Sequence, residues 1–169
     1  MKILIGITGS NAALKTSYII KELINLNHEV ICISTKNSEG FGIVKELEAI
    51  DKLSYYKHCY KQKINLDNID VVAIIPASYN FIGKFSHGIS DDLLLKSLFC
   101  IDSKFILCPA MNSVMWENKI LQENILSLKN SDITIVNPRV GILTSGKKAI
   151  GVLEKEDNII KIINDINLN

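Results

Sequence analysis

The chain has 169 residues, 47% of them hydrophobic, which suits one domain with a sizeable buried core and excludes intrinsic disorder. Its 19 basic and 18 acidic residues give a formal net charge of +1, which argues against a nucleic-acid binder or a membrane-surface binder. No apolar run reaches the ~20 residues that cross a bilayer, and the N-terminus lacks the pattern of a signal peptide, so we expect a cytoplasmic protein.

Short apolar runs alternate along the chain with segments of helical period. The sequence predicts strands at residues 2–7, 29–33, 71–75, 105–108 and 133–136, and helices at residues 11–26, 39–50, 91–99, 117–128 and 157–166. This order predicts an α/β fold, with a doubly wound, mostly parallel sheet in a single domain over residues 1–169. Residues 51–68 and 137–154 fit neither period, and we interpret the second stretch as a flap or substrate-clamp loop.

The cysteines and histidines give few chemical signals. The four cysteines show no CxxC spacing, so we predict neither a metal site nor a redox pair. Cys32 and Cys108 lie in apolar strands and are expected to be free and buried. His28 fits a surface loop and His87 a helix end, whereas His58 lies in an irregular stretch beside tyrosines and is a candidate acid/base.

Four loops that follow predicted strands carry small and polar residues, at positions 8–11, 34–36, 76–80 and 109–112. In a doubly wound sheet, ligands bind beyond the carboxyl ends of the strands, so these loops should line one rim. Gly9 and Ser10 do not make a GxGxxG motif, but a glycine and a hydroxyl at a helix start form a phosphate site. An ordinary turn capped by Ser10 explains the same residues. Together the loops predict a planar cofactor that carries a phosphate.

Four segments carry a resemblance to a known family. Residues 109–116 match PAMNxxMW in full, and residues 76–80 resemble PASANT. Residues 6–13 look like GxTGSIAA, and residues 83–94 are similar to the helix that follows PASANT. Over about residues 2–150 the chain thus resembles the homo-oligomeric flavin-containing cysteine decarboxylases. That family includes 4′-phosphopantothenoylcysteine decarboxylase of coenzyme A biosynthesis and the epidermin-type peptidyl-cysteine decarboxylases of lantibiotic biosynthesis.

The resemblance implies a Rossmann-like (flavodoxin-like) fold, FMN held at a subunit contact, and a trimer or a dodecamer. The family's reaction passes hydride from a cysteine side chain to FMN, after which the carboxylate leaves as CO2 and an enethiol forms. Asn112 would bind the substrate carboxylate. The residues assigned to FMN, from the rim positions and the resemblance together, are Gly9, Ser10, Asn11, Ser34, Thr35, Ser78, Tyr79, Asn80, Phe81, Ala110 and Met111.

The chain departs from the family pattern at two places. Lys63 stands where the family has a catalytic histidine in an HIxL motif, so Lys63 or His58 would serve as the acid/base. In the clamp loop, Thr144, Ser145 and Gly146 replace the Ala-Cys-Gly of the phosphopantothenoylcysteine enzymes. Serine has no thiol redox chemistry, and peptidyl-cysteine decarboxylases also carry serine there.

Three functions follow from this pattern. The favoured one is an FMN-dependent oxidative decarboxylase of a cysteine carboxylate, with a peptide's C-terminal cysteine as the substrate. The second is a 4′-phosphopantothenoylcysteine decarboxylase, with a cysteine-containing small molecule as the substrate. The third is a catalytically silent FMN-binding or regulatory subunit, which the missing histidine motivates.

Overall fold

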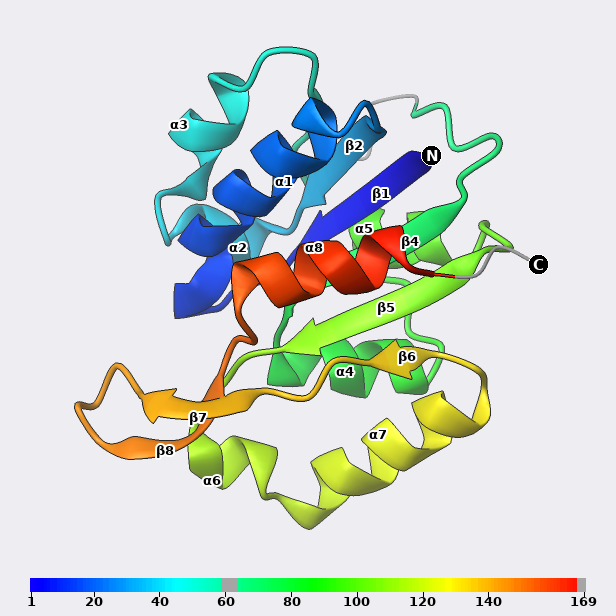
Figure 1. Cartoon of the computed structure of the whole chain (residues 1–169). Coiled ribbons are helices and arrows are strands. Elements are labelled where there is room, and N and C mark those ends of the chain that lie inside the picture. Colours follow the sequence, from blue (N-terminus) through cyan, green and yellow to red (C-terminus); the bar gives the residue numbers. More distant parts are fainter. Residues whose placement is uncertain (59–63, 167–169) are drawn as a thin grey trace.

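The apolar runs of the sequence become the strands of one parallel sheet. The computed structural model describes residues 1–58 and 64–166 (Figure 1). The sheet has the order β3-β2-β1-β4-β5-β6, and every neighbouring pair is parallel. Its strands are β1 (Lys2–Ile7), β2 (Glu29–Ser34), β3 (Ser54–Tyr56), β4 (Val71–Ala77), β5 (Lys104–Pro109) and β6 (Thr134–Ile135). This topology confirms the predicted doubly wound α/β fold.

Side chains alternate between the two faces of each strand, so both faces of the sheet are apolar. Ile3, Ile5 and Ile7 of β1 pack in a cluster with one group of helices, and Leu4 packs in a second cluster with another group. The first group consists of α1 (Thr16–Asn25), α3 (Ile43–Glu48) and α8 (Glu156–Asn164). The second group, on the opposite face, consists of α4 (Tyr79–Ser86), α5 (Leu93–Leu98) and α7 (Lys119–Asn130) (Figure 1).

The structure differs from the sequence predictions in the shorter elements. The helix predicted at 39–50 is two helices, α2 (Lys36–Glu39) and α3, because residues 40–42 with their two glycines interrupt it. The stretch at 51–68 contains the edge strand β3, whose three residues are too few to show a period. The stretch at 137–154 contains an antiparallel hairpin of β7 (Arg139–Ile142) and β8 (Lys148–Val152).

The strand order reverses between β1 and β4, which places the point where ligands bind in such sheets. From β1 the chain crosses over to β2 on one side, and β4 then pairs with β1 on the other side. The loops that follow β1 and β4 therefore leave the sheet in opposite directions and open a crevice at its carboxyl edge. The short helices η1 (Asn11–Lys15) and α6 (Ser113–Trp116) begin beside this edge, directly after the loops that follow β1 and β5.

Candidate active site

A cavity of about 750 Å³ lies at the carboxyl edge of the sheet. Loops that follow β1, β2, β4 and β5 line it, together with residues of the β7–β8 hairpin. The structure thus brings together residues from both ends of the sequence, from Thr8 to Leu153. The sequence-predicted residues that line the cavity are Gly9, Ser10, Asn11, Thr35, His58, Ser78, Tyr79, Asn80, Phe81, Ala110, Met111, Asn112, Thr144 and Ser145.

Two of the described residues that the sequence assigned to the site do not line the cavity. Ser34 is fully buried, and its hydroxyl lies 2.7 Å from the Tyr55 hydroxyl, so it joins β2 to the edge strand β3. Burial raises the pKa of Tyr55 to about 12, which keeps this phenol neutral. Gly146 lies in the hairpin turn with φ +79°, a conformation that favours glycine. Lys63 lies outside the described residues.

Thr8 joins the loop after β1 to the loop after β4. Its hydroxyl donates to the Pro76 carbonyl oxygen at 2.7 Å and accepts from the Ser78 backbone N–H at 2.8 Å. Ser78 then caps α4 by accepting from the Phe81 N–H at 3.3 Å. Only 2% of the Thr8 surface is exposed. The sequence analysis did not assign a role to this residue. These bonds fix the position of the Ser78 backbone at the crevice.

Ser10 joins the loop after β1 to the loop after β5. It is the N-cap of η1 and accepts from the Ala12 N–H, and its hydroxyl donates to the Ala110 carbonyl oxygen at 3.1 Å. The alternative of an ordinary capped turn is therefore present in the structure. The turn at Ser10 also lines the cavity. Ser10 can therefore cap η1 and still belong to a phosphate site.

The side-chain amide of Asn112 is oriented by a backbone N–H of the helix α6 that it caps. Its Oδ1 accepts from the Val114 N–H at 2.9 Å, which caps α6. This bond uses the acceptor side of the carboxamide and leaves the two N–H donors of Nδ2, which match a carboxylate. Asn112 is exposed and lines the cavity.

The β7–β8 hairpin is attached to the cavity rim at two points. At its tip, the Asn11 amide donates to the Thr144 hydroxyl at 2.8 Å. At its base, the Met111 backbone N–H donates to the Gly151 carbonyl oxygen at 3.0 Å. Gly151 has φ +129°, and a Cβ at this position would overlap the Met111 carbonyl oxygen, so the close approach requires glycine. The hairpin is thereby fixed to the loop that carries Asn112.

Apart from Lys36 in the predicted rim segment 34–36, the sequence analysis did not name the charged residues Lys15, Lys84 and Asp91 of the cavity wall. Lys84 and Asp91 form an ion pair, and Lys15 pairs with Glu156 at 2.8 Å. Burial opposes ionisation of Glu156, but the hydrogen bond and the charge of Lys15 hold its pKa below the ordinary value. Lys36 also lines the cavity. A signal for Lys15 was present in the sequence. Lys15 follows Ser10 by five residues, so the two residues lie at opposite ends of the short helix η1 beside the cavity.

A family comparison identifies the protein class. The Flavoprotein family matches residues 1–168. The chain belongs to this family. A curated relative, the coenzyme A biosynthesis bifunctional protein CoaBC of Borreliella burgdorferi, is 36% identical over 95% of this chain. The CoaBC protein of Bacillus subtilis is 26% identical, also over 95% of this chain. The chain spans 43% and 41% of the length of these two relatives.

Solved structures share the whole fold of this Flavoprotein family member. A PPC decarboxylase variant complexed with pantothenoylaminoethenethiol is 26% identical, with a TM-score of 0.85 and 96% of both chains covered. The peptidyl-cysteine decarboxylase EpiD is also 26% identical, with a TM-score of 0.82 over 97% of this chain and 98% of its own. Proteins that act on a small cysteine compound and on a peptidyl cysteine are thus both similar to this chain.

The three described cysteines of this Flavoprotein family member do not line the cavity. Cys32 and Cys108 are fully buried and free, as predicted, and burial raises the pKa of both thiols. Cys100 is free and exposed, and Cys59 lies outside the described residues. Within residues 1–58 and 64–166, no cysteine lines the cavity and no group of three or more metal-ligating side chains occurs. No helix in that same part of the chain is long and apolar enough to span a bilayer.

Proposed function

We propose that this chain binds FMN and catalyses the oxidative decarboxylation of a cysteine carboxylate to an enethiol. The observation that carries this proposal is the cavity at the switch point of the sheet, where the PAMN loop presents the Nδ2 donors of Asn112. Membership of the Flavoprotein family and the similarity to two cysteine decarboxylases support the same conclusion.

The residues around the cavity fit FMN. Its volume of about 750 Å³ is within the range of ~300–1,000 Å³ that is typical of cofactor sites. Ser10, Asn11 and Thr35 offer polar groups for the phosphate end, and the nearby cation of Lys36 favours an anion. The segments 78–81 and 110–111 supply the flat and apolar contacts that a ring system needs.

Bound FMN would supply the redox chemistry by accepting a hydride equivalent from the cysteine side chain. The chain's own residues bind and orient the substrate. Asn112 would donate to the carboxylate through Nδ2, which holds the amino acid backbone in one orientation until CO2 leaves. The hairpin, tied to Asn11 at its tip, would cover the substrate and exclude water.

We infer that the substrate is a peptide with a C-terminal cysteine. Ser145 lines the cavity at the position where the resemblance places the thiol that reduces the enethiol product in phosphopantothenoylcysteine enzymes. A serine hydroxyl does not transfer electrons, so the reaction would end at the enethiol. The absence of any cysteine among the described residues of the cavity wall supports this outcome.

A second candidate substrate is 4′-phosphopantothenoylcysteine. The 36% identity to a coenzyme A biosynthesis protein and the TM-score of 0.85 to a PPC decarboxylase favour it. This function would require that the enethiol be accepted as the product or that another thiol reduce it. The chain spans less than half of the length of the bifunctional relatives, so the similarity concerns one part of those proteins.

Product mass distinguishes these functions. The FMN-loaded protein is incubated with cysteine-terminated peptides and with 4′-phosphopantothenoylcysteine, and each product is analysed by mass spectrometry. We expect loss of CO2 plus two hydrogens from a peptide, with one equivalent of flavin reduced. If only 4′-phosphopantothenoylcysteine shows this loss of mass, it is the substrate and the peptide is not. A yellow protein that converts neither compound would overturn the proposed enzymatic function and would favour the catalytically silent FMN-binding subunit.

The assembly and location of the protein stay predictions. Several large apolar side chains are exposed at the surface, which supports a homo-oligomer such as the expected trimer or dodecamer. They include Leu14, Tyr18, Val114, Val140 and Ile142. The cytoplasmic location rests on the composition of the sequence alone.

A further inference from the structure

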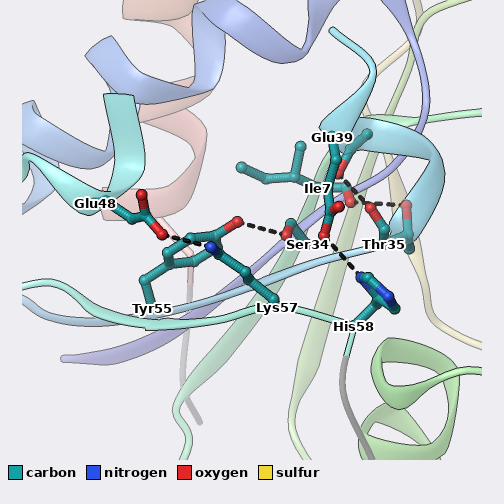
Figure 2. Close-up of polar contacts among 9 residues, drawn as sticks. Ile7, Ser34, Thr35, Glu39, Glu48, Tyr55, Lys57 and His58 are labelled. Atoms are coloured by element: carbon teal, nitrogen blue, oxygen red, sulfur yellow. Dashed lines mark hydrogen bonds and ion pairs between the residues drawn. The ribbon is translucent and has the colours of Figure 1, made fainter. Parts of the chain in front are cut away.

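His58 and Glu39 form a hydrogen-bonded pair (Figure 2). Nδ1 of His58 lies 2.7 Å from Oε1 of Glu39, and the two side chains keep 39% and 31% of their surface exposed. His58 lines the cavity, whereas Glu39 does not. The carboxylate therefore holds the imidazole from outside the cavity.

The Glu39 side of this pair is anchored to the centre of the sheet. Glu39 is the last residue of α2, and Thr35, which precedes α2, donates to the Ile7 carbonyl oxygen through its backbone N–H at 2.9 Å. The Thr35 hydroxyl donates to the same oxygen at 3.3 Å. Ser38 closes the turn by donating to the Thr35 carbonyl oxygen at 2.7 Å. Glu39 thus projects from a helical turn that is fixed to the end of β1.

The His58 side is anchored through the edge strand β3. Tyr55 bonds to Ser34 of β2 at 2.7 Å, and Lys57 forms an ion pair with Glu48 of α3 at 2.5 Å. Figure 2 shows both contacts beside the His58–Glu39 pair. Two different elements, α2 and the segment after β3, therefore bring the imidazole and the carboxylate together across 19 residues of sequence.

The carboxylate determines where the imidazole carries its proton. A carboxylate oxygen accepts hydrogen bonds only, so the neutral ring keeps its proton on Nδ1 and leaves the lone pair on Nε2. No described residue is hydrogen-bonded to Nε2. The other two histidines are absent from the cavity wall: His28 bonds to the N-terminal amine and to Asn164, and His87 ends α4.

We propose that His58 is the catalytic base of this site and that Glu39 is the positioning residue that fixes its tautomer. This inference rests on the proposed function. The S–H bond of the substrate cysteine breaks, its proton forms a bond with Nε2 of His58, and the electron pair stays on sulfur as a thiolate. The imidazolium is stabilised by the Glu39 carboxylate and returns its proton to solvent after product release.

The tautomer of His58 is measured without any substrate. The ¹⁵N and ¹H chemical shifts of the imidazoles are recorded above the pH at which they lose their charge, and the His58→Ala variant identifies the His58 signals. We expect the proton on Nδ1 in the wild type and in Glu48→Ala, a control that removes the neighbouring carboxylate which pairs with Lys57. In Glu39→Ala we expect a shift toward the Nε2–H form. A wild-type ring that carries its proton on Nε2 would overturn the proposal.

The base itself is tested by the rate at which a cysteine-terminated peptide reduces bound FMN. We expect His58→Ala to be about 100-fold slower and Glu39→Ala about 10-fold slower, with FMN affinity within about twofold of wild type. Added imidazole should restore part of the rate of His58→Ala, because a small base can enter the space left by the ring. A His58→Ala variant that reduces FMN at the wild-type rate contradicts the proposal.

Failure of this proposal and failure of the proposed function give different results. A wild-type protein that binds FMN but is reduced by no cysteine compound overturns the proposed function, and with it the role of His58 as a base. The proposal alone fails when the wild type is reduced but the His58 variant is equally fast. In both cases the tautomer measurement decides separately whether Glu39 orients the ring.

Discussion

At the scale of single residues, several side chains of the cavity have a structural and a binding role at the same time. Ser10, Ser78 and Asn112 each cap a short helix with a side-chain oxygen, and each also lines the cavity. The cap limits the side chain to one orientation, so its remaining hydrogen-bonding groups point in a defined direction. Helix starts are therefore the natural source of binding groups in this fold.

The carboxylate role of Asn112 is tested by Asn112→Asp. Aspartate keeps the oxygen that caps α6 but replaces the two N–H donors with a negative charge that repels the substrate carboxylate. We expect FMN binding to be retained and the KM for a cysteine carboxylate to rise about 10- to 100-fold, as a lost charge-assisted hydrogen bond of ~1.5–3 kcal/mol implies. Steady-state kinetics with the best substrate measures this.

Asn118→Asp is the matched control. Asn118 caps α7 by the same bond, accepted by Oδ1 from the N–H two residues later at 2.9 Å, and it is not part of the cavity wall. Asn118 Oδ1 also accepts from the Tyr79 hydroxyl at 3.5 Å, a bond that aspartate keeps, so the two variants make the same chemical change at different positions. Equal KM values for Asn112→Asp and Asn118→Asp would show that Asn112 does not bind the carboxylate.

The limits of sequence reading are also clear at single residues. Ser34 and Thr35 are adjacent and both polar, so the sequence assigned both to the cofactor. Of the two, Thr35 lines the cavity, because it lies in the loop between β2 and α2, whereas Ser34 ends β2 and bonds to Tyr55, a tyrosine 21 residues away. The partner of a buried hydroxyl depends on a long-range strand pairing, which a single sequence does not contain.

At the scale of elements, the β7–β8 hairpin is the feature that the periodicity could not reveal. Its strands have four and five residues and lie on the surface, so they show neither a buried run nor a long alternation. The glycine at position 151 was visible in the sequence, but its purpose depends on the close approach of Met111, which only the structure shows.

Gly151→Ala tests how the hairpin is held. Alanine is strained at φ +129°, and its Cβ would overlap the Met111 carbonyl oxygen, so the hairpin and the Asn112 loop must move apart. We expect the free energy of unfolding to fall by about 1–3 kcal/mol and substrate KM to rise more than FMN affinity falls. Denaturant unfolding and kinetics on the same sample measure both.

Gly83→Ala supplies the control for the glycine substitution itself. Gly83 lies inside α4, and nothing is within 4 Å of a Cβ built there. An alanine in a helix interior is favoured over glycine by about 0.5–1 kcal/mol, so this variant should be as stable as wild type or slightly more stable. If Gly151→Ala and Gly83→Ala have the same stability and the same KM, the close contact between Gly151 and Met111 does not hold the hairpin in place.

At the scale of the whole molecule, the central part of the fold followed from the sequence because parallel strands buried on both faces are continuously apolar. The predicted strands at 29–33, 71–75 and 105–108 each lie within the observed strands β2, β4 and β5. Helical stripes between them predict right-handed crossovers and hence a mostly parallel sheet, whereas the strand order comes from the structure. The shape and wall charges of the cavity did not follow, since they arise from loops that meet only after folding.

The central claim is that these loops form a site for a flat ring with an anionic tail, and flavin binding tests it most directly. The purified protein is stripped of ligand and titrated with FMN and with riboflavin, while absorbance and flavin fluorescence are recorded. We predict one FMN bound per chain, with flavin absorption bands, and riboflavin binding at least about 10-fold weaker because it lacks the phosphate. A protein that stays colourless and takes up neither flavin would contradict the account.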